Sequence, residues 1–104
     1  MLKPSLTELR ASRDPWKYIK ENIPLVIATA HDSLQTILNS PDLEHHLERK
    51  YRKGEAEYHN EWLSRDEATW LVMEADEEIL DFIVYCAMFM TFVQSKAIED
   101  HGRD

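Results

Sequence analysis

Glycine and cysteine are scarce in this chain, with 2 glycines and 1 cysteine among 104 residues. Tight turns between β-strands depend on residues such as glycine, so the shortage disfavours a sheet and suits helices. A single cysteine, Cys86, excludes a disulfide within the chain and is typical of a reducing compartment. No basic, apolar, small-residue leader opens the sequence. We therefore expect a cytoplasmic location.

Several function classes lack their usual signature. No glycine-rich phosphate loop, no HExxH motif and no arrangement of nucleophilic serine, histidine and aspartate is present. The net charge of −8 argues against binding to a nucleic-acid backbone, which relies on Lys and Arg. The longest apolar run, from Ile79 to Val93, is shorter than a membrane span and contains Asp81. We expect neither nucleic acid nor a membrane as partner.

Signals for helix starts recur along the chain. Capping side chains stand before a proline or in capping boxes at Ser5–Glu8, Asp14-Pro15, Ser40-Pro41 and Ser64–Glu67. Apolar residues repeat every three or four positions between these signals, which predicts helices over 5–13, 15–39, 41–60 and 65–98. Pro24 should kink or split the second helix, because it removes one backbone donor. Gly54 can interrupt the third helix.

These helices predict an all-α fold, an antiparallel bundle of about four helices in a single domain over 1–104. We expect residues 1–40 to form N-terminal helices, residues 41–98 to form a metal-binding helix pair, and residues 99–104 to form a tail. A last helix of about 34 residues, apolar all round for half its length, is hard for one small chain to cover. We expect a homodimer or a higher homo-oligomer to bury the remaining face.

Acidic residues are concentrated at the end of the chain, where residues 65–104 carry a net charge of −7. At about 100° per residue, Glu74, Glu77, Glu78 and Asp81 share an arc of roughly 100° on one side of the last helix. Carboxylates this close repel one another and raise one another's pKa. A divalent cation would relieve the repulsion, and ligands that are all oxygen favour Mg²⁺, Mn²⁺ or Ca²⁺.

Asp81 strengthens this interpretation because it lies within an apolar run. A carboxylate removed from water must be paired, protonated or bound to a metal. Two other interpretations stay open. The glutamates can be a solvated face, since acids suit the first half of a helix, and Asp81 can pair with Arg or Lys.

The stretch Glu77-Glu78-Ile-Leu-Asp81-Phe-Ile-Val-Tyr85 resembles the E-E-x-x-D helix of the MazG-like, all-α nucleoside triphosphate pyrophosphohydrolases. The stretch from Gly54 to Leu63 is similar to the helix and turn that precede it in short, often phage-borne relatives. The resemblance covers about residues 42–95. It implies a helical bundle, usually a dimer or tetramer, that holds Mg²⁺ on carboxylates from two neighbouring helices. The implied reaction hydrolyses a nucleoside triphosphate to the monophosphate and pyrophosphate.

The resemblance assigns roles by position. Glu78 and Asp81 match the E-x-x-D pair and would hold Mg²⁺ or Mn²⁺, with Glu57, Glu61 or Glu74 completing the ligand set. Glu61 or Glu77 would be the base that activates water. The family's E-x-x-E pair is not matched, because Glu57 and Glu61 are four residues apart. That spacing still puts both on one side of a helix, provided the helix continues through them.

Two further features allow more than one interpretation. The basic cluster Arg49–Lys53 can clamp phosphates or can be a solvated face with a Glu48–Arg52 pair. The acidic last helix can belong to a non-catalytic module that docks a basic protein surface or mimics nucleic acid. An enzyme requires its carboxylates to converge in a cleft, whereas a docking module spreads them over a convex surface.

Overall fold

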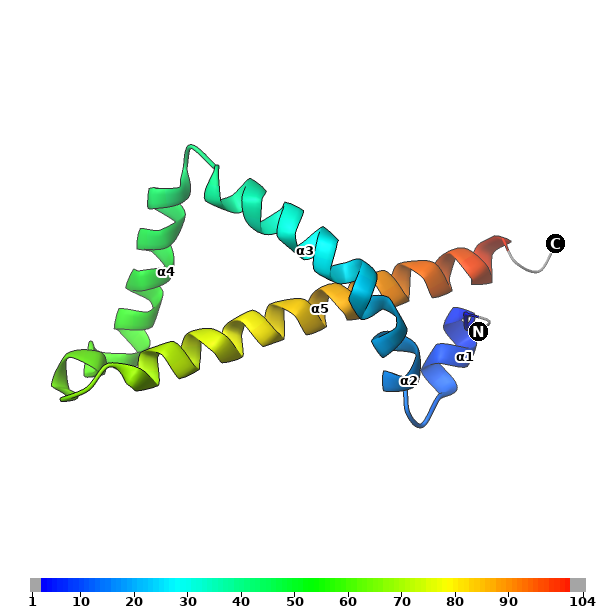
Figure 1. Ribbon diagram of the computed structural model, residues 1–104, viewed down its shortest axis with the longest axis horizontal. Coiled ribbons are helices and arrows are strands. Elements are labelled where there is room, and N and C mark those ends of the chain that lie inside the picture. Colours follow the sequence, from blue (N-terminus) through cyan, green and yellow to red (C-terminus); the bar gives the residue numbers. More distant parts are fainter. Residues whose placement is uncertain (1–2, 102–104) are drawn as a thin grey trace.

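The computed structural model describes residues 3–101, and this part of the chain is all-α (Figure 1). The elements are α1 (Leu6–Ala11), α2 (Trp16–Ile19), the 3₁₀ turn η1 (Lys20–Asn22), α3 (Ile23–Leu38), α4 (Leu43–Tyr58), the 3₁₀ turn η2 (Glu61–Ser64) and α5 (Thr69–His101). Every predicted helical segment is present. The expected tail is helical as far as His101, and residues 102–104 lie outside the described residues.

Local sequence signals explain how the N-terminal helices begin. Ser5 caps α1, because its Oγ accepts a hydrogen bond from the backbone N–H of Glu8 at 3.2 Å. The predicted interruption at Pro24 is confirmed: a 3₁₀ turn ends at Asn22, and Pro24 lies in the first turn of α3. Its missing donor costs nothing at that position.

One end of the molecule is packed. Near the C-terminal half of α5, α1, α2 and α3 converge on it, and the buried apolar side chains include Val26, Ala30 and Ala87. A buried hydrogen bond joins Asn22 Nδ2 to Thr91 Oγ1 at 2.6 Å. The Thr91 hydroxyl in turn donates to the carbonyl of Ala87 at 2.8 Å, so this polar pair is satisfied within the core. We call this region the packed end.

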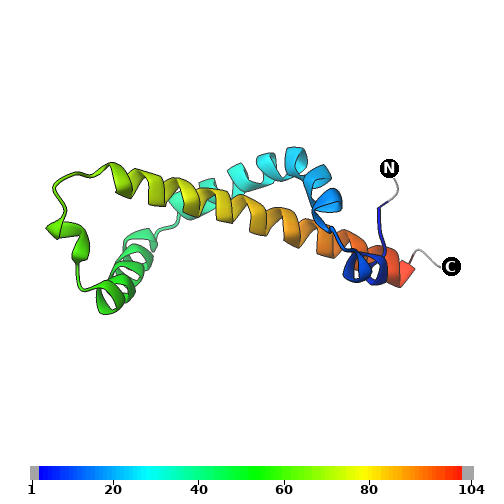
Figure 2. The same ribbon diagram turned by 90° about the horizontal axis from the view of Figure 1, so that it is seen from below.

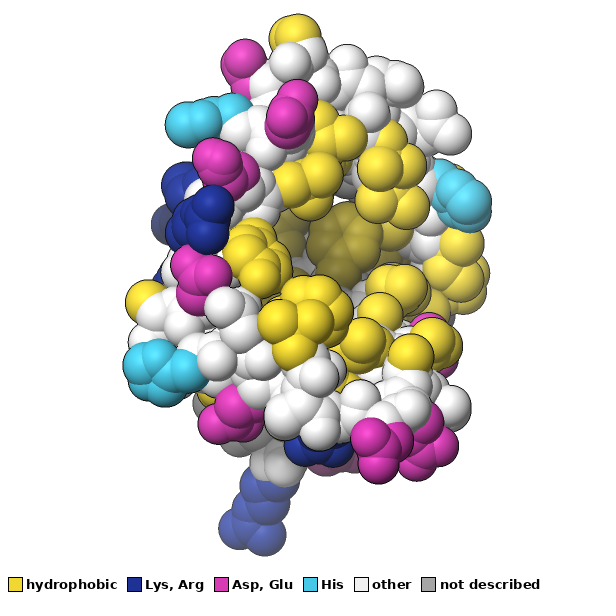
Figure 3. All heavy atoms as spheres, turned by 90° about the vertical axis from the view of Figure 1, so that its left-hand side faces the viewer, with side chains coloured by type: hydrophobic (Ala, Val, Ile, Leu, Met, Phe, Trp, Pro, Cys, Tyr) yellow, Lys and Arg dark blue, Asp and Glu magenta, His cyan; other side chains and the backbone are white. Residues whose placement is uncertain are grey.

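The other end is open. Helices α3, α4 and α5 form the sides of a triangle, and α4 touches the rest of the molecule mainly near its ends (Figure 1). Figure 2 shows that the triangle is not flat, since α4 lies on one side of α5 and the first turns of α3 on the other. Seen along the long axis, apolar side chains surround a hollow (Figure 3). We call α4, η2 and the first half of α5 the open end.

The dimensions of the molecule show that a single copy is much less compact than a typical domain of this length. Its radius of gyration is 18.5 Å over extents of 59 × 33 × 24 Å, whereas a compact domain of this length has a radius of about 13 Å. A single copy is therefore an open triangle rather than a packed bundle. The antiparallel bundle and its completion by a second copy remain predictions.

Three local predictions need correction or comment. The capping box at Ser64–Glu67 is wrong: α5 begins at Thr69, and the Ser64 hydroxyl donates instead to the carbonyl of Glu61 at 2.7 Å. Gly54 does not interrupt α4, which continues to Tyr58. By length and composition alone α5 is long and apolar enough to cross a membrane, a test that the core helices of soluble proteins also pass.

Candidate functional site

A cavity of about 500 Å³ lies in the corner where α4 ends and α5 begins. Its lining combines carboxylates, cations and aromatic rings from α4, η2, the segment before α5 and the first turns of α5. The residues are Lys50, Tyr51, Gly54, Glu55, Tyr58, Asn60, Glu61, Trp62, Arg65, Trp70, Leu71, Glu74 and Glu78. Its volume is within the range of small-molecule sites, which measure about 300 to 1,000 Å³.

A sharp turn gives the cavity its shape. His59 and Asn60 have φ angles of 53° and 59°. These values lie in the left-handed region, which residues other than glycine rarely adopt. His59 ends α4 as its C-cap, and its N–H donates to the carbonyl of Glu55. The chain then reverses into η2, which directs Glu61 and Trp62 back toward α5.

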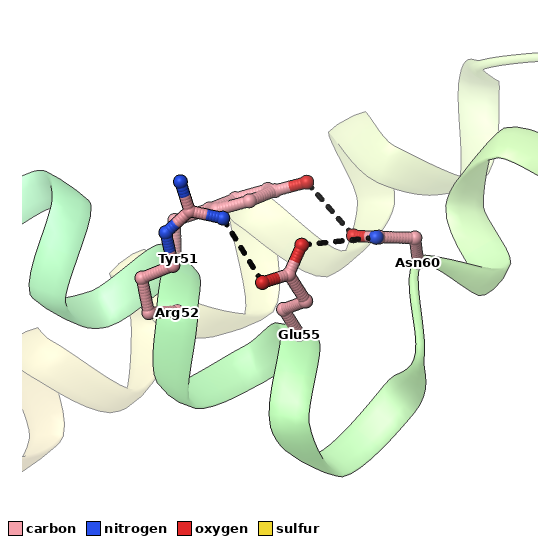
Figure 4. Close-up of polar contacts among 4 residues, drawn as sticks. All are labelled: Tyr51, Arg52, Glu55 and Asn60. Carbon is pink, nitrogen blue, oxygen red and sulfur yellow. Dashed lines mark hydrogen bonds and ion pairs between the residues drawn. The ribbon is translucent and has the colours of Figure 1, made fainter.

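Asn60 is held in this conformation by a network with α4 (Figure 4). The Tyr51 hydroxyl donates to Asn60 Oδ1 at 2.8 Å, and Asn60 Nδ2 donates to Glu55 Oε2 at 3.0 Å. The other oxygen of Glu55 accepts from Arg52 Nη1 at 3.0 Å, which is also an ion pair. Three side chains of one helix thus fix the turn that forms one wall of the cavity.

The network also changes the ionisation of Glu55. The hydrogen bond from Asn60, followed by the hydrogen bond and charge of Arg52, lowers the pKa of the Glu55 carboxyl below its ordinary value. The same pairing raises the pKa of Arg52. Glu55 is therefore ionised at neutral pH, and both of its oxygens already have partners. It supports the turn rather than serving as a free ligand.

Aromatic rings and cations line the remainder of the cavity. The Arg65 guanidinium lies over the Trp70 ring, 4.2 Å from the ring centroid. The indole N–H of Trp70 is buried and has no acceptor within residues 3–101. Buried donors without a partner are uncommon in folded proteins, and this one is available to an acceptor on a bound ligand. Together with Lys50 these residues give the cavity positive charge and stacking surfaces beside its carboxylates.

The predicted site residues divide into two groups. Glu61, Glu74 and Glu78 all line the cavity, although Glu61 comes from η2 and the other two from α5. Glu57, Glu77 and Asp81 are exposed and do not line it. Asp81 is not buried in a single copy, because nothing within the described chain covers this part of α5.

The expected pairing of Glu57 with Glu61 on one helix face is wrong. Helix α4 ends at Tyr58, and the left-handed residues His59 and Asn60 separate the two glutamates. Glu61 reaches the cavity because of this reversal, while Glu57 stays on the exposed surface of α4. The expected Glu48–Arg52 pair is also replaced, since Arg52 bonds to Glu55.

No group of three or more His, Cys, Asp or Glu side chains among residues 3–101 is placed to hold a metal ion. The donor chemistry in the cavity nevertheless suits one kind of ion. Mg²⁺ commonly binds proteins through one or two carboxylates, and water and substrate phosphates complete its six ligands. Glu74 and Glu78, one turn apart on α5, are a donor set of that size.

Several lining residues were not predicted from the sequence. Glu55, Asn60, Arg65 and Trp70 belong to no recognisable motif, and the role of Asn60 depends on a left-handed turn. The only available signal was the cluster of turn-forming residues His59-Asn60 after an amphipathic helix. Comparison of the chain with protein-family models, curated proteins and solved structures gives no match.

Proposed function

We propose that this protein hydrolyses a nucleoside or deoxynucleoside triphosphate to the monophosphate and pyrophosphate, with Mg²⁺ or Mn²⁺. One observation carries the proposal: a single cavity brings carboxylates, two cations and several aromatic rings together. A nucleotide requires all three, namely a stacking surface for the base, cations for the phosphates and oxygen ligands for the metal. The resemblance of Glu77–Tyr85 to the MazG-like motif supports the choice of reaction.

The cavity residues suggest a division of labour. Trp62, Trp70 or Tyr58 would stack on the base, and Lys50 and Arg65 would bind phosphate oxygens. Glu61 would accept the proton from the attacking water, because it faces the cavity from η2, apart from the α5 pair. The network of Tyr51, Glu55 and Asn60 would keep Glu61 in place.

Glu74 and Glu78 would hold the metal, with Asp81 one turn further along α5 as an additional ligand. When bound, Mg²⁺ neutralises charge on the phosphate oxygens and lowers the barrier to attack at phosphorus. Glu77 and Glu57 lie outside the cavity lining, so in this proposal they have no direct contact with substrate.

A screen of pyrophosphate release over the eight common NTPs and dNTPs, with Mg²⁺ and with Mn²⁺, tests the proposal. We expect at least one nucleotide to be cleaved to the monophosphate. Absence of turnover with all eight nucleotides and both metals would contradict it.

Two neighbouring glutamates give a matched pair of variants. Glu78→Gln should lower kcat/KM by at least about 100-fold, because an amide is a poor ligand and metal stabilisation of the transition state amounts to several kcal/mol. Glu77→Gln makes the same chemical change one residue away, outside the cavity, and should change kcat/KM by less than about threefold. Equal losses in both variants would show that the cavity is not the active site.

One observation favours the second candidate, a non-catalytic acidic docking module. Glu77 and Asp81 project from an exposed helix rather than into the cavity. In that case Glu77→Gln would weaken binding of a basic protein while Glu78→Gln would not, and no nucleotide would be cleaved. The two candidates thus predict opposite rankings of the same variants.

We also propose that the protein works in the cytoplasm as a homodimer or higher homo-oligomer. The exposed apolar surface around the hollow supports the assembly. The single cysteine supports the location.

A further inference from the structure

The hollow of the open end lacks an occupant in one copy of the chain. The chain exposes 8760 Å² of surface, whereas a compact monomer of 12.3 kDa exposes about 6,100 Å². The difference of about 2,700 Å² per chain amounts to about 5,400 Å² over two chains, which is at the upper end of what a permanent homodimer buries over both partners, about 2,000 to more than 5,000 Å². Large apolar side chains account for much of this surface, with Leu47, Tyr85 and Phe89 59%, 68% and 68% exposed.

Helix α4 adds a second argument from its own stability. Its apolar residues Leu43, Leu47, Tyr51 and Tyr58 recur on one side, yet no other described helix packs along it. Isolated helices of this length are marginal in water, and most helices are stabilised by packing of an amphipathic face. The hollow therefore requires an apolar, elongated occupant.

The chain itself carries such a segment on α5. At about 100° per residue, one stripe of this helix stays within an arc of about 80°. We call it the α5 stripe, and it consists of Leu71, Glu74, Glu78, Asp81, Tyr85, Phe89, Phe92, Lys96 and Glu99. Helix α3 packs at Ala87 and Thr91, roughly a quarter turn away or more, so it leaves the stripe uncovered. Phe89 and Phe92 also line an apolar groove of about 380 Å³ with Leu9, Pro15 and Ile19.

Charge along the α5 stripe sets the direction in which two copies can pair. Carboxylates occupy its first third and aromatic rings its middle. Its far end carries Lys96, the only Lys or Arg of α5, and Glu99, whose carboxylate accepts hydrogen bonds from Thr7. A parallel pair would place Glu74, Glu78 and Asp81 against their own copies, and like charges repel. An antiparallel pair places the carboxylates against the opposite end and joins the aromatic rings at the centre.

We propose that a second copy of this chain fills the hollow, with the two α5 helices packed antiparallel along the α5 stripe about a two-fold axis near residue 87. Tyr85 then meets Phe89 of the partner subunit. Lys96, which pairs with Asp100 of its own helix, lies opposite the acidic first third of the partner's α5. Each α4 covers the partner's α5, and the partner closes the cavity on its Asp81 side. Both the hollow and its occupant belong to the same chain, as an isologous interface requires.

Light scattering on the wild-type chain gives the first test. At micromolar concentration we expect the mass of two chains, or of another even number of chains, each of 12.3 kDa. A mass of one chain would overturn the proposal. The measurement needs no nucleotide, so its result is independent of the proposed hydrolase activity.

Oxidative cross-linking tests the orientation, with Cys86→Ser as the parent. Met88→Cys, beside the predicted axis, should form a disulfide between copies. Glu74→Cys lies on the α5 stripe, but antiparallel pairing separates the two copies of this residue by about 39 Å along the helix, and it should not cross-link. Cross-linking through Glu74→Cys and not through Met88→Cys would overturn the antiparallel arrangement. Circular dichroism confirms that each variant is folded.

Discussion

The packed end and the open end of this molecule differ in how far their side chains are buried. At the packed end, the first thirty residues bury Val26 and Ala30 against Ala87, and the buried Asn22 bonds to Thr91. At the open end, residues 71–81 are all exposed, and α4 extends away from its neighbours. Yet the open end contains the cavity, whose lining includes carboxylates and cations.

The comparison shows that the contacts that stabilise the fold and the side chains proposed to carry out chemistry lie in different parts of the molecule. Buried apolar contacts stabilise the packed end without presenting any chemical group. The open end instead relies on side-chain hydrogen bonds around Asn60, and its large apolar side chains are exposed in a single copy. Stability and proposed chemistry thus lie at opposite ends of α5, and variants at each end should behave differently.

The largest expected difference comes from one substitution made at both ends. Val26→Asp buries an unpaired carboxylate where the native side chain is 0% exposed, and it should cost about 3 to 5 kcal/mol of unfolding free energy. Val72→Asp, at a residue 61% exposed and opposite the α5 stripe, should cost no more than about 0.5 kcal/mol. Thermal melts followed by circular dichroism measure both. Similar losses would show that the open end is as tightly covered as the packed end.

A middle-sized effect should come from the turn at the open end. Asn60→Ala loses the hydrogen bonds to Tyr51 and Glu55. It also places alanine, which has a Cβ but no polar side chain, at a φ of 59°, so the free energy of unfolding should fall by about 2 kcal/mol. Asn60→Gly loses the same bonds but tolerates the backbone, so about half of that loss should return. Urea unfolding distinguishes the two. If Asn60→Gly were no more stable than Asn60→Ala, the left-handed backbone at this position would not contribute to the loss of stability.

The smallest effect should be a pH dependence at Glu55. Its folded pKa lies below its ordinary value because Asn60 and Arg52 bond to the ionised form. The folded state thus binds fewer protons than the unfolded state, so this contribution is fully present above the ordinary glutamate pKa. It is lost as the pH falls through the lowered folded pKa. Melting temperatures of wild type and Glu55→Gln should differ at pH 7 and converge in acid; a constant gap would contradict this linkage.

The helices could be predicted because their signals are local. The Ser5 cap, the interruption at Pro24 and the apolar repeats each depend on residues within one or two turns. The start of α5 was missed for the same reason. Ser64–Glu67 has the sequence of a capping box, but the Ser64 hydroxyl closes the preceding 3₁₀ turn instead.

The candidate site was only partly predictable. Helical spacing correctly placed Glu74 and Glu78 on one face, but it could not show which face meets the end of α4. Glu61 enters through a left-handed turn, and such turns leave little trace in a sequence when they lack glycine. Asp81 lies in an apolar run yet is exposed, because no other described element covers this part of α5, and the pattern of apolar residues does not specify where the neighbouring helices lie.

The hydrogen bonds between Thr7 and Glu99, 92 residues apart, have a consequence for how the protein is made. The first thirty residues have their packing partner in the last stretch of the chain, from Ala87 onward. At about 5 to 20 residues per second, a ribosome takes about 3 to 11 s to synthesise the stretch between them. During that time the apolar faces of α1 and α3 have no native surface to cover them. The packed end can therefore form only after residues 87–99 have been synthesised, and until then these apolar faces stay exposed.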